Sequence, residues 1–543
     1  MKKARAFLMG NETEYSMALA PDEPSDIRSS ESTSLVRRRN SQLHDVLLAA
    51  IRERHDWLPD VRGNGGIYID NGARYYLDTG NHNEFSSPEL STPRDLATYD
   101  RAAERILRRA QADVRAGADG LNIAVTKSNI NFSMPDRATW GLHEAYTCRV
   151  PLRDAAPQLM AHLVSRVPYA GAGYLSAESR GTGFELSQRA RHMTRPMGVE
   201  TTRDRAIFCT RSWKPSDVSE TGWRRTNLIC KDSQRCSFGV YLSHGVTGLL
   251  FMIINEGHRI GRTMKLKNPV AAMRSISLDP TLKARVELSD GRQVTALDIQ
   301  RTYLREAKPH VESGCFPQWT AELWNHWSDT VDQLDNDPGQ LADRLDTYLK
   351  FKLFDRQLKR AELTWPMLRE ALGVLTMARH RTTESVIAAV LSEDGSQLSK
   401  EDLVLFRQLS SHRDVKRVGL ERLCFAVRLQ AVELNYHELG GLFDQLNDAG
   451  KIDSVVVDPD AVEPAMHRPP AGGRAEARSQ SIVEASGEGW ACDWEYVIHR
   501  ADKQWYDLRD PFSNERELTT FPDDSQLARS SSMLASLISR LSD

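Results

Sequence analysis

The sequence has no excess of charge of either sign and no apolar segment long enough to cross a membrane. Its formal net charge is −3, so it lacks the basic field with which proteins hold nucleic acid or anionic lipid. The best apolar run, Leu249 to Ile254, is far too short for a bilayer, and the first residues lack the apolar core and cleavage site of a signal peptide. We therefore expect a soluble, cytoplasmic protein that binds neither nucleic acid nor membrane.

Cysteine is also scarce. The seven cysteines among 543 residues form no C-x-x-C pair, which predicts reduced, mostly packed thiols rather than a disulfide framework. The sequence has no G-x-x-x-x-G-K-[ST] loop and no evident internal repeat, so any ATP must bind without a P-loop. A chain of this length can bury a large core and can form two or more domains.

The most informative stretch, Asn71 to Glu89, reads NGARYYLDTGNHNEFSSPE and predicts a strand, a turn and a second strand. Alternation along the first strand puts three side chains on one face, those of Arg74, Tyr76 and Asp78. Beyond the turn, a second set shares a face, namely His82, Glu84 and Ser86. Two carboxylates and an imidazole are thus predicted to converge.

A second acidic contribution comes from the N-terminus. The run Ala6 to Met9 is typical of a buried central strand, and we expect Glu12 and Glu14 to project to one side of its end. Acids on the ends of neighbouring strands repel one another unless a cation lies between them, and oxygen-rich clusters suit Mg²⁺ or Mn²⁺. The alternative is an exposed, solvated strand end.

Elsewhere the pattern predicts mixed helices and strands. The polar segment Pro21 to Ser41 is predicted to be a loop, either a simple connection or a gate over the site. Helices are expected over Leu43–Trp57 and Tyr99–Ala116, and strands over Leu121–Val125 and Trp140–Val150. On the last strand His143 and Glu144 point to opposite faces, so one of them faces the site.

Several motifs, in order and over nearly the whole chain, resemble the family of Pup ligases and Pup deamidases (depupylases). They are GNETEYS at Gly10–Ser16, the Asn71–Glu89 stretch, YDRAAERIL at Tyr99–Leu107, TWGLHEAY at Thr139–Tyr146, FELSQRA at Phe184–Ala190, DGRQVTALDIQRTY at Asp290–Tyr303, KFKLFDR at Lys350–Arg356, LNYHEL at Leu434–Leu439, PPAGGRAEAR at Pro469–Arg478 and RDPF at Arg509–Phe512.

The resemblance implies an α+β fold, a glutamine-synthetase-like antiparallel sheet cradle backed by helices. It further implies a catalytic domain over residues 1–455 and a small C-terminal domain over residues 456–543, which ends in an apolar helical stripe from Leu527 to Leu541. The family motifs are absent from Glu362 to Ala426, which we interpret as a helical insertion, either a partner surface or a decoration, with a helix cap at Ser399. A polar stretch, Asp458 to Ser481, precedes a β-rich end.

The resemblance also implies roles for individual residues, with ATP and Mg²⁺ as cofactors. Asp78 takes the position of the base, and the metal ligands are Glu12, Glu14, Tyr76, Glu84 and His143. Contacts with ATP, phosphate or the modifier fall to Arg74, Ser87, Arg189, Arg211 and Trp494, since guanidinium groups bind such anions in bidentate fashion. A core histidine and a core tryptophan are the competing interpretations of His143 and Trp494; Arg203 and Arg205 stay open.

The segment WRRTNLICKDSQRCS at Trp223–Ser237 departs from the family pattern. Asn227 stands at a histidine position, and three further departures follow, at Lys231, Gln234 and Ser237. The positions that keep the pattern are Arg224, Arg225, Asp232 and Ser233. Asparagine offers a carbonyl oxygen to a hard cation but has no imidazole. One metal ligand and part of the nucleotide pocket are therefore altered.

The implied function is a ligase that joins the C-terminal glutamate side chain of a Pup-like or ubiquitin-like modifier to a lysine of a target protein. Forming this amide requires an acyl phosphate, because a carboxylate is a poor electrophile. LDTGNH resembles the ligases, whereas SSPE, GFELSQRA and MGVETT resemble the deamidases. We favour the ligase, with a deamidase or depupylase as the alternative and a catalytically weakened binding homologue as the third hypothesis.

Overall fold

The computed structural model describes residues 7–19, 33–63, 65–117, 120–130, 139–210, 222–377, 386, 389, 394–411, 418–453, 455–485, 489–499, 501–502 and 504–520. Arg211 and the apolar stripe from Leu527 to Leu541 lie outside these residues. So does the first part of the predicted polar loop, up to residue 32.

An eight-stranded antiparallel sheet, in the order β12-β7-β1-β5-β4-β3-β2 with β6 also paired to β1, forms the centre of the protein. Its strands are β1 (Met9–Leu19), β2 (Trp57–Pro59), β3 (Ile67–Ile69), β4 (Arg74–Leu77), β5 (Asn83–Ser86), β6 (Ile123–Thr126), β7 (Leu142–Cys148) and β12 (Arg224–Leu228). The predicted strand-turn-strand unit is β4 and β5, with Tyr76 opposite Glu84.

Strand β1 begins later than the sequence predicted. Of the apolar run, Phe7 and Leu8 precede the strand, which runs from Met9 to Leu19 and contains Glu12 and Glu14 in its interior rather than at its end. Buried carboxylates are unusual in a central strand because desolvation disfavours them. Their presence there, on one face, marks that face as a site rather than a core surface.

Helices cover the face of the sheet opposite the one that carries Glu12 and Glu14. Helices α1 (Thr33–Arg52), α2 (Pro93–Ala116) and α5 (Ser237–Asn255) pack against β4, β1 and β7, respectively. Helix α1 starts inside the segment that was predicted to be a loop up to Ser41, so that prediction is wrong from Thr33 onward. The expectation that no segment is long and apolar enough to cross a membrane is wrong by length and composition, because α5, which contains Leu249–Ile254, passes that test, alone among the described helices. The window is 94% buried inside the protein.

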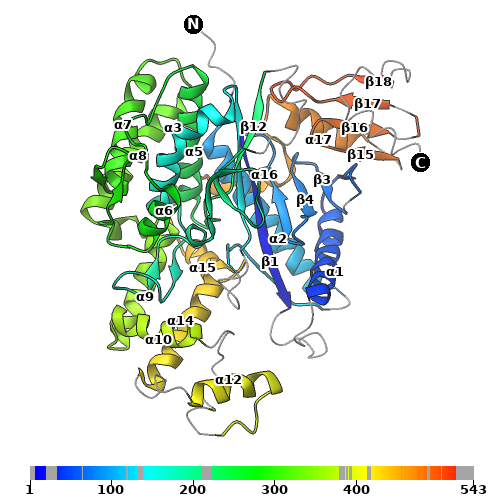
Figure 1. Cartoon of the computed structure of the whole chain (residues 1–543). Coiled ribbons are helices and arrows are strands. Elements are labelled where there is room, and N and C mark those ends of the chain that lie inside the picture. Colours follow the sequence, from blue (N-terminus) through cyan, green and yellow to red (C-terminus); the bar gives the residue numbers. More distant parts are fainter. Residues whose placement is uncertain are drawn as a thin grey trace.

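A helical body extends from one side of the sheet (Figure 1). It contains α3 (Leu152–Ser165), α4 (Val167–Ala170), α6 (Pro269–Ser277), α7 (Ala296–Glu312), α8 (Trp319–Asn336), α9 (Asp346–Arg360) and α15 (Leu442–Asp448). Short two-stranded pairs accompany these helices: β8 (Tyr174–Leu175) with β9 (Phe184–Glu185), β10 (Arg195–Gly198) with β11 (Ala206–Cys209), and β13 (Val286–Glu287) with β14 (Gln293–Val294).

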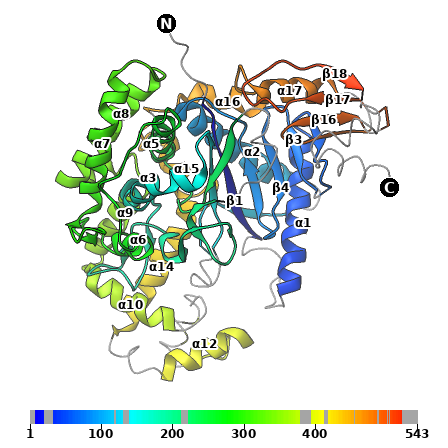
Figure 2. The ribbon, with the colours of Figure 1, turned by 45° about the horizontal axis from the view of Figure 1, so that its top comes forward.

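The predicted helical insertion is present as α10 (Trp365–Met377), α12 (Lys400–Ser411) and the start of α14 (Leu420–His437). Ser399 caps α12 as expected, because its hydroxyl accepts a hydrogen bond of 3.1 Å from the amide of Asp402. These helices point away from the sheet in both views (Figures 1 and 2), and α12 lies far from the C-terminal strands.

The C-terminal part packs against the opposite side of the sheet from α7 and α8 (Figure 2). The polar stretch Asp458–Ser481 contains two helices, α16 (Pro459–His467) and α17 (Arg474–Glu484), followed by a four-stranded sheet of β15 (Trp490–Cys492), β16 (Tyr496–His499), β17 (Gln504–Asp507) and β18 (Leu518–Thr520). A β-bridge between Asp60 and Cys492 joins the two sheets. The structure therefore has the predicted α+β class; the division at residue 455 stays a prediction.

All seven cysteines are free thiols, and five of them are buried. This confirms the expectation that cysteine contributes packing rather than disulfides.

Candidate active site

Strand register collects the predicted acidic residues on the face of the sheet that the helices leave uncovered. Glu14 on β1 lies directly opposite Glu84 on β5, and Glu84 lies opposite Tyr76 on β4. Glu12 lies opposite His143 on β7. Like charges placed directly across an antiparallel pair destabilise a sheet, so this arrangement needs positive charge nearby.

The first cluster consists of Glu12, Glu84 and His143, whose ligand atoms lie within 4.8 Å of one another. His143 Nδ1 is 3.1 Å from Glu12 Oε2 and 3.5 Å from Glu84 Oε1. Arg225 on β12 makes a close ion pair with the other oxygen of Glu12. Histidine is therefore the link between the two carboxylates.

The charges in this cluster shift its pKa values in opposite directions. Burial and the charge of Glu12 raise the pKa of Glu84 well above its usual value. Burial opposes ionisation of Glu12 too, but the charge of Arg225 and the hydrogen bond from His143 outweigh it and lower the pKa. Burial disfavours protonated His143, yet the carboxylates around it raise its pKa to about 9. In the absence of a metal, the imidazolium supplies the missing positive charge.

The second cluster consists of Glu14, Asp78 and His82, again with ligand atoms within 4.8 Å. Asp78 directly follows β4 and accepts a hydrogen bond of 2.6 Å from the backbone amide of His82, which closes the β4–β5 turn. His82 Nδ1 lies 3.5 Å from Asp78 Oδ2 and 3.8 Å from Glu14 Oε2. Burial would raise the pKa of Asp78, but its bonds with His82 outweigh this and lower it, so Asp78 is an anion at neutral pH.

Two contributors to these clusters were absent from the predicted site. Alternation puts His82 on the correct face without giving it a role, and Arg225 only keeps the family pattern. Arg225 lies on β12, which β7 separates from the strand of Glu12, and a basic side chain that reaches across one strand is what such buried acids require.

Both clusters fit a divalent cation. Within the described chain, Glu84 Oε1 is buried and has no hydrogen-bond partner, which is costly unless a cation satisfies it. Carboxylate oxygens are the ligands that Mg²⁺ prefers, and imidazole suits Mn²⁺ and other transition metals. Tyr76, opposite Glu84, has a hydroxyl whose pKa burial and Glu84 raise well above its usual value, so its oxygen is a neutral neighbour rather than an anionic ligand.

Arg74 extends this face toward the C-terminal part. It forms a close ion pair with buried Asp60, and its guanidinium carbon lies 3.6 Å from the ring centre of Tyr76. Asp60 was not predicted; it pairs with Arg74, which also interacts with the charge of Glu12 in the first cluster. Because this pair leaves the guanidinium beside the first cluster, Arg74 is positioned to contact an anion there.

Ser87 and Trp494 occupy the same side of the sheet as Arg74. The Ser87 hydroxyl accepts a 3.0 Å hydrogen bond from the amide of Asn11 and donates to the Pro88 carbonyl. Trp494 packs edge-on against Tyr68 at 5.2 Å and lies under the guanidinium of Arg478 at 4.7 Å. Trp494 is half-buried, so one part of the indole remains open to a ligand.

Arg189 lies at the other end of the site and is buried. It donates hydrogen bonds to the carbonyls of Ile229 (2.6 Å) and Trp140 (2.5 Å), and burial lowers its pKa to about 10. Part of its donor set is thus used in fastening two segments. The sequence analysis assigns no role to Arg203 and Arg205. Arg203 is exposed, while the charge of Arg205 interacts with both Glu14 and Arg189.

The departures from the family pattern lie in different places. Asn227 is buried on the site face of β12, and its Oδ1 lacks a hydrogen-bond partner among the described residues. Buried Lys231 instead interacts with Glu144 and Arg166, which form an ion pair behind the sheet. The Gln234 amide donates to the carbonyl of Tyr169 at 3.0 Å. Glu144 thus faces away from the site and His143 toward it, as alternation required.

Comparison with known proteins yields one family. The sequence profile described as "Pup-ligase protein" matches residues 7–404 and 403–498. A depupylase from Acidothermus cellulolyticus is 30% identical over 449 residues, 80% of this chain and 75% of the relative. A Pup–protein ligase from Acidimicrobium ferrooxidans is 28% identical over 464 residues, 84% of this chain and 88% of the relative.

Two solved structures share the fold. The ligase PafA in complex with the prokaryotic ubiquitin-like protein Pup superposes with a TM-score of 0.69 and 21% identity, covering 99% of this chain and 92% of that chain. PafA in complex with ADP gives a TM-score of 0.64 at 21% identity, covering 96% and 98%. The likeness confirms the predicted glutamine-synthetase-like fold.

Proposed function

Because the chain belongs to the Pup-ligase family, we propose that it is an ATP- and Mg²⁺-dependent isopeptide ligase. It joins the side-chain carboxylate of the C-terminal glutamate of a Pup-like modifier to a lysine of a target protein, in the cytoplasm. The observation that carries this proposal is the pair of clusters, Glu12–Glu84–His143 and Glu14–Asp78–His82, on one face of one sheet.

The clusters suit the first half of the reaction. Two divalent cations held there would offset the charge of the ATP phosphates and of the transferred phosphoryl group. Arg74, Ser87 and Trp494 on one flank are assigned to the nucleotide by their match to the family motifs, and the use of a nucleotide is supported by the complex of the related PafA with ADP. Arg189 is assigned to phosphate or the modifier carboxylate at the other end, near Glu14; Arg211 keeps the same assignment by sequence alone.

Asp78 suits the second half. Its carboxylate is ionised, partly exposed and held by the β4–β5 turn. A lysine side chain must lose a proton before its amine can attack the acyl phosphate, and Asp78 is the anion positioned to accept it. Nitrogen then replaces the phosphate at the acyl carbon, which releases inorganic phosphate and leaves the isopeptide bond.

The test is conjugation with purified components. Wild type, mixed with ATP, Mg²⁺, a Pup that ends in glutamate and a lysine-bearing protein, should yield a conjugate of higher mass. Asp78→Asn should slow conjugate formation by about 10²- to 10⁴-fold, the usual contribution of a general base, and should still bind ATP. Equal rates for the two proteins would rule out Asp78 as the base.

The alternative is a depupylase or deamidase, favoured by the relative from Acidothermus cellulolyticus. That activity would release unmodified target, or ammonia from a Pup that ends in glutamine, without net consumption of ATP. A binding protein without turnover is the third possibility, suggested by Asn227. Calorimetric ATP binding without hydrolysis or transfer would identify it.

A further inference from the structure

A third cluster of metal-ligating side chains lies on the helix-covered face of the sheet, away from the proposed active site. It consists of His55, between α1 and β2, Asp70, directly after β3, and His467, the last residue of α16. Their ligand atoms lie within 4.8 Å of one another. His55 Nδ1 is 2.8 Å from Asp70 Oδ1, and His467 Nδ1 is 3.3 Å from Asp70 Oδ2.

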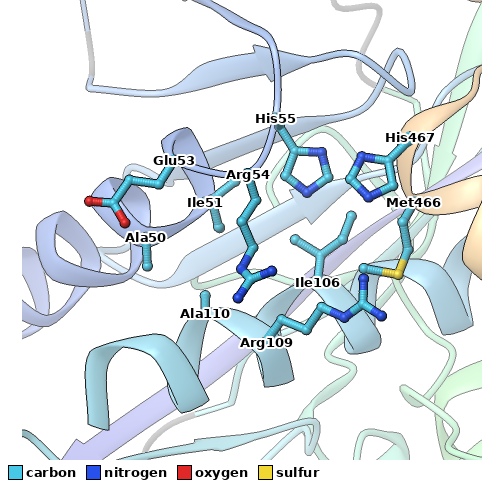
Figure 3. Close-up of a pocket in the computed structure, with 10 residues that line it drawn as sticks. All are labelled: Ala50, Ile51, Glu53, Arg54, His55, Ile106, Arg109, Ala110, Met466 and His467. Carbon is cyan, nitrogen blue, oxygen red and sulfur yellow. The ribbon is translucent and has the colours of Figure 1, made fainter. Parts of the chain in front are cut away.

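The two imidazoles stand side by side at the rim of a cavity of about 260 Å³ (Figure 3). Their ring centres are 4.5 Å apart and nearly parallel. Apolar side chains, including Ile51, Ile106 and Met466, line the cavity. A ligand held between the histidines would therefore keep one side open to this space.

The surrounding structure holds the three residues in place. The Ser479 hydroxyl bonds the backbone carbonyl of Asp70, and the Asp70 amide donates to the Asp56 carbonyl at 2.9 Å. The Asn71 side chain donates to the carbonyl of Ala465 in α16 at 3.0 Å. Three segments far apart in sequence are thus fastened before any ligand arrives.

We propose that His55, Asp70 and His467 bind a transition-metal ion of the Zn²⁺ type, with a fourth position open to water at the cavity. Two imidazoles and one carboxylate suit Zn²⁺ rather than Mg²⁺, which prefers oxygen ligands. Three protein ligands with an open position form a recurrent zinc arrangement.

The local electrostatics favour a cation at this point. His467 ends α16, where the helix dipole is negative. The two arginines at the cavity are already paired, Arg54 with Asp113 and Arg109 with Glu463, the latter through two bonds of 2.8 Å. Glu463 also pairs with Arg105 at 3.6 Å and interacts with the charge of His467, so the arginines are partly neutralised and Asp70 supplies the negative charge that balances the metal.

The consequence is a metal link between the N-terminal sheet and the C-terminal part of the chain. His55 and Asp70 belong to the sheet region, whereas His467 belongs to α16, which packs on α2. A bound ion would stabilise the docking of α16. This role does not depend on the ligase reaction, so its test is independent of activity.

The experiment counts bound Zn²⁺ by equilibrium dialysis and elemental analysis, with Mg²⁺ in large excess so that it occupies the acidic clusters. All proteins carry Cys315→Ser, because Cys315 is the exposed thiol. The test variant is His467→Asn, whose amide can still donate to Asp70. The matched control is His310→Asn, since His310 and His258 form a similarly close pair, with ring centres 4.3 Å apart, in a place where the described residues offer no third ligand.

Wild type and His310→Asn should each bind one Zn²⁺ more than His467→Asn, and the difference in X-ray absorption between wild type and His467→Asn should show two imidazoles in the coordination shell of that ion. His467→Asn should bind Zn²⁺ more than about 10- to 100-fold more weakly, because loss of a residue that merely supports a ligand already costs about that much. His467→Asn should also lose the Zn²⁺-induced rise in melting temperature while melting at the same temperature as wild type without metal. Absence of Zn²⁺ from wild type, or equal binding by His467→Asn, would overturn the proposal.

Discussion

Replacing Glu84 by glutamine should stabilise the metal-free protein and destabilise the Mg²⁺-loaded protein relative to wild type. Glu84 is buried beside Glu12, and the ligand atoms of their cluster lie within 4.8 Å. At that separation and an effective dielectric constant of about 20, two unit charges repel by about 3.5 kcal/mol. His143 offsets part of this, so we expect Glu84→Gln to add about 1–3 kcal/mol to the free energy of unfolding without metal.

The sign of this effect follows from the raised pKa of Glu84. An acid whose pKa is higher in the folded than in the unfolded state binds more protons when folded, so wild type loses stability as pH rises above the usual glutamate pKa. A glutamine side chain does not titrate, so residue 84 of the variant contributes no pH dependence to the stability. The advantage of Glu84→Gln should therefore grow from about pH 5 toward pH 8.

Mg²⁺ should reverse the order. An ion that binds only the folded state adds about 4.1 kcal/mol at about 1,000 times its dissociation constant, and at that Mg²⁺ concentration wild type should gain this in full whereas Glu84→Gln gains less. The assay is urea unfolding, with and without Mg²⁺, compared by midpoint.

Glu144→Gln is the matched control for this experiment. Glu144 is equally buried but lies behind the sheet, where burial opposes its ionisation and an ion pair with Arg166 outweighs that cost, lowering its pKa to about 2. This variant should lose about 3–5 kcal/mol under both conditions. A metal-free Glu84→Gln less stable than wild type, or equal Mg²⁺ stabilisation of both, would refute the reasoning.

Two further predictions concern the edges of the site. Burial opposes ionisation of Glu89, but Arg478 and Arg474 outweigh it and lower the pKa of Glu89 from 4.5 to about 2. Because this pKa is depressed in the folded state, the ionised carboxylate stabilises the fold, and this stabilisation is lost as pH falls from 4.5 toward 2. At about 1.4 kcal/mol per pKa unit, it amounts to about 3 kcal/mol. Glu89→Gln should therefore loosen strands β15–β18 at neutral pH, measured as faster amide hydrogen exchange there, and unchanged exchange would count against it. Asn227→His should place an imidazole on the site face and tighten Mn²⁺ binding about tenfold or more by calorimetry, whereas unchanged affinity would mean that residue 227 is not a ligand position.

Much of the site could be predicted because strand alternation needs only sequence. The period of two placed Tyr76 and Glu84 on one face and separated His143 from Glu144, and the structure agrees. The start of β1 could not be found in this way. A buried strand that contributes Glu12 and Glu14 to a site lacks the apolar pattern of a core strand, so its polar interior was interpreted as a strand end.

Long-range partners were harder still. Asp60, which pairs with Arg74, directly follows β2, whereas Arg74 begins β4, and the sequence spacing of the two residues does not predict their contact. The helix α16 is hard to predict because the stretch around it, Asp458–Ser481, is polar as a whole and is interrupted by proline and glycine. A local signal for it existed, however, since Asp458 caps this helix: its side chain accepts a hydrogen bond from the amide of Asp460, and Pro459 stands at the first helical position.

The most direct test of the proposed reaction is the amount of ADP formed per isopeptide bond, measured in one reaction by a coupled ADP assay and by mass spectrometry of the conjugate. A ligase that acts through an acyl phosphate should form one ADP and one phosphate for each conjugate. Conjugates that form, or disappear, without matching ADP production would contradict the account.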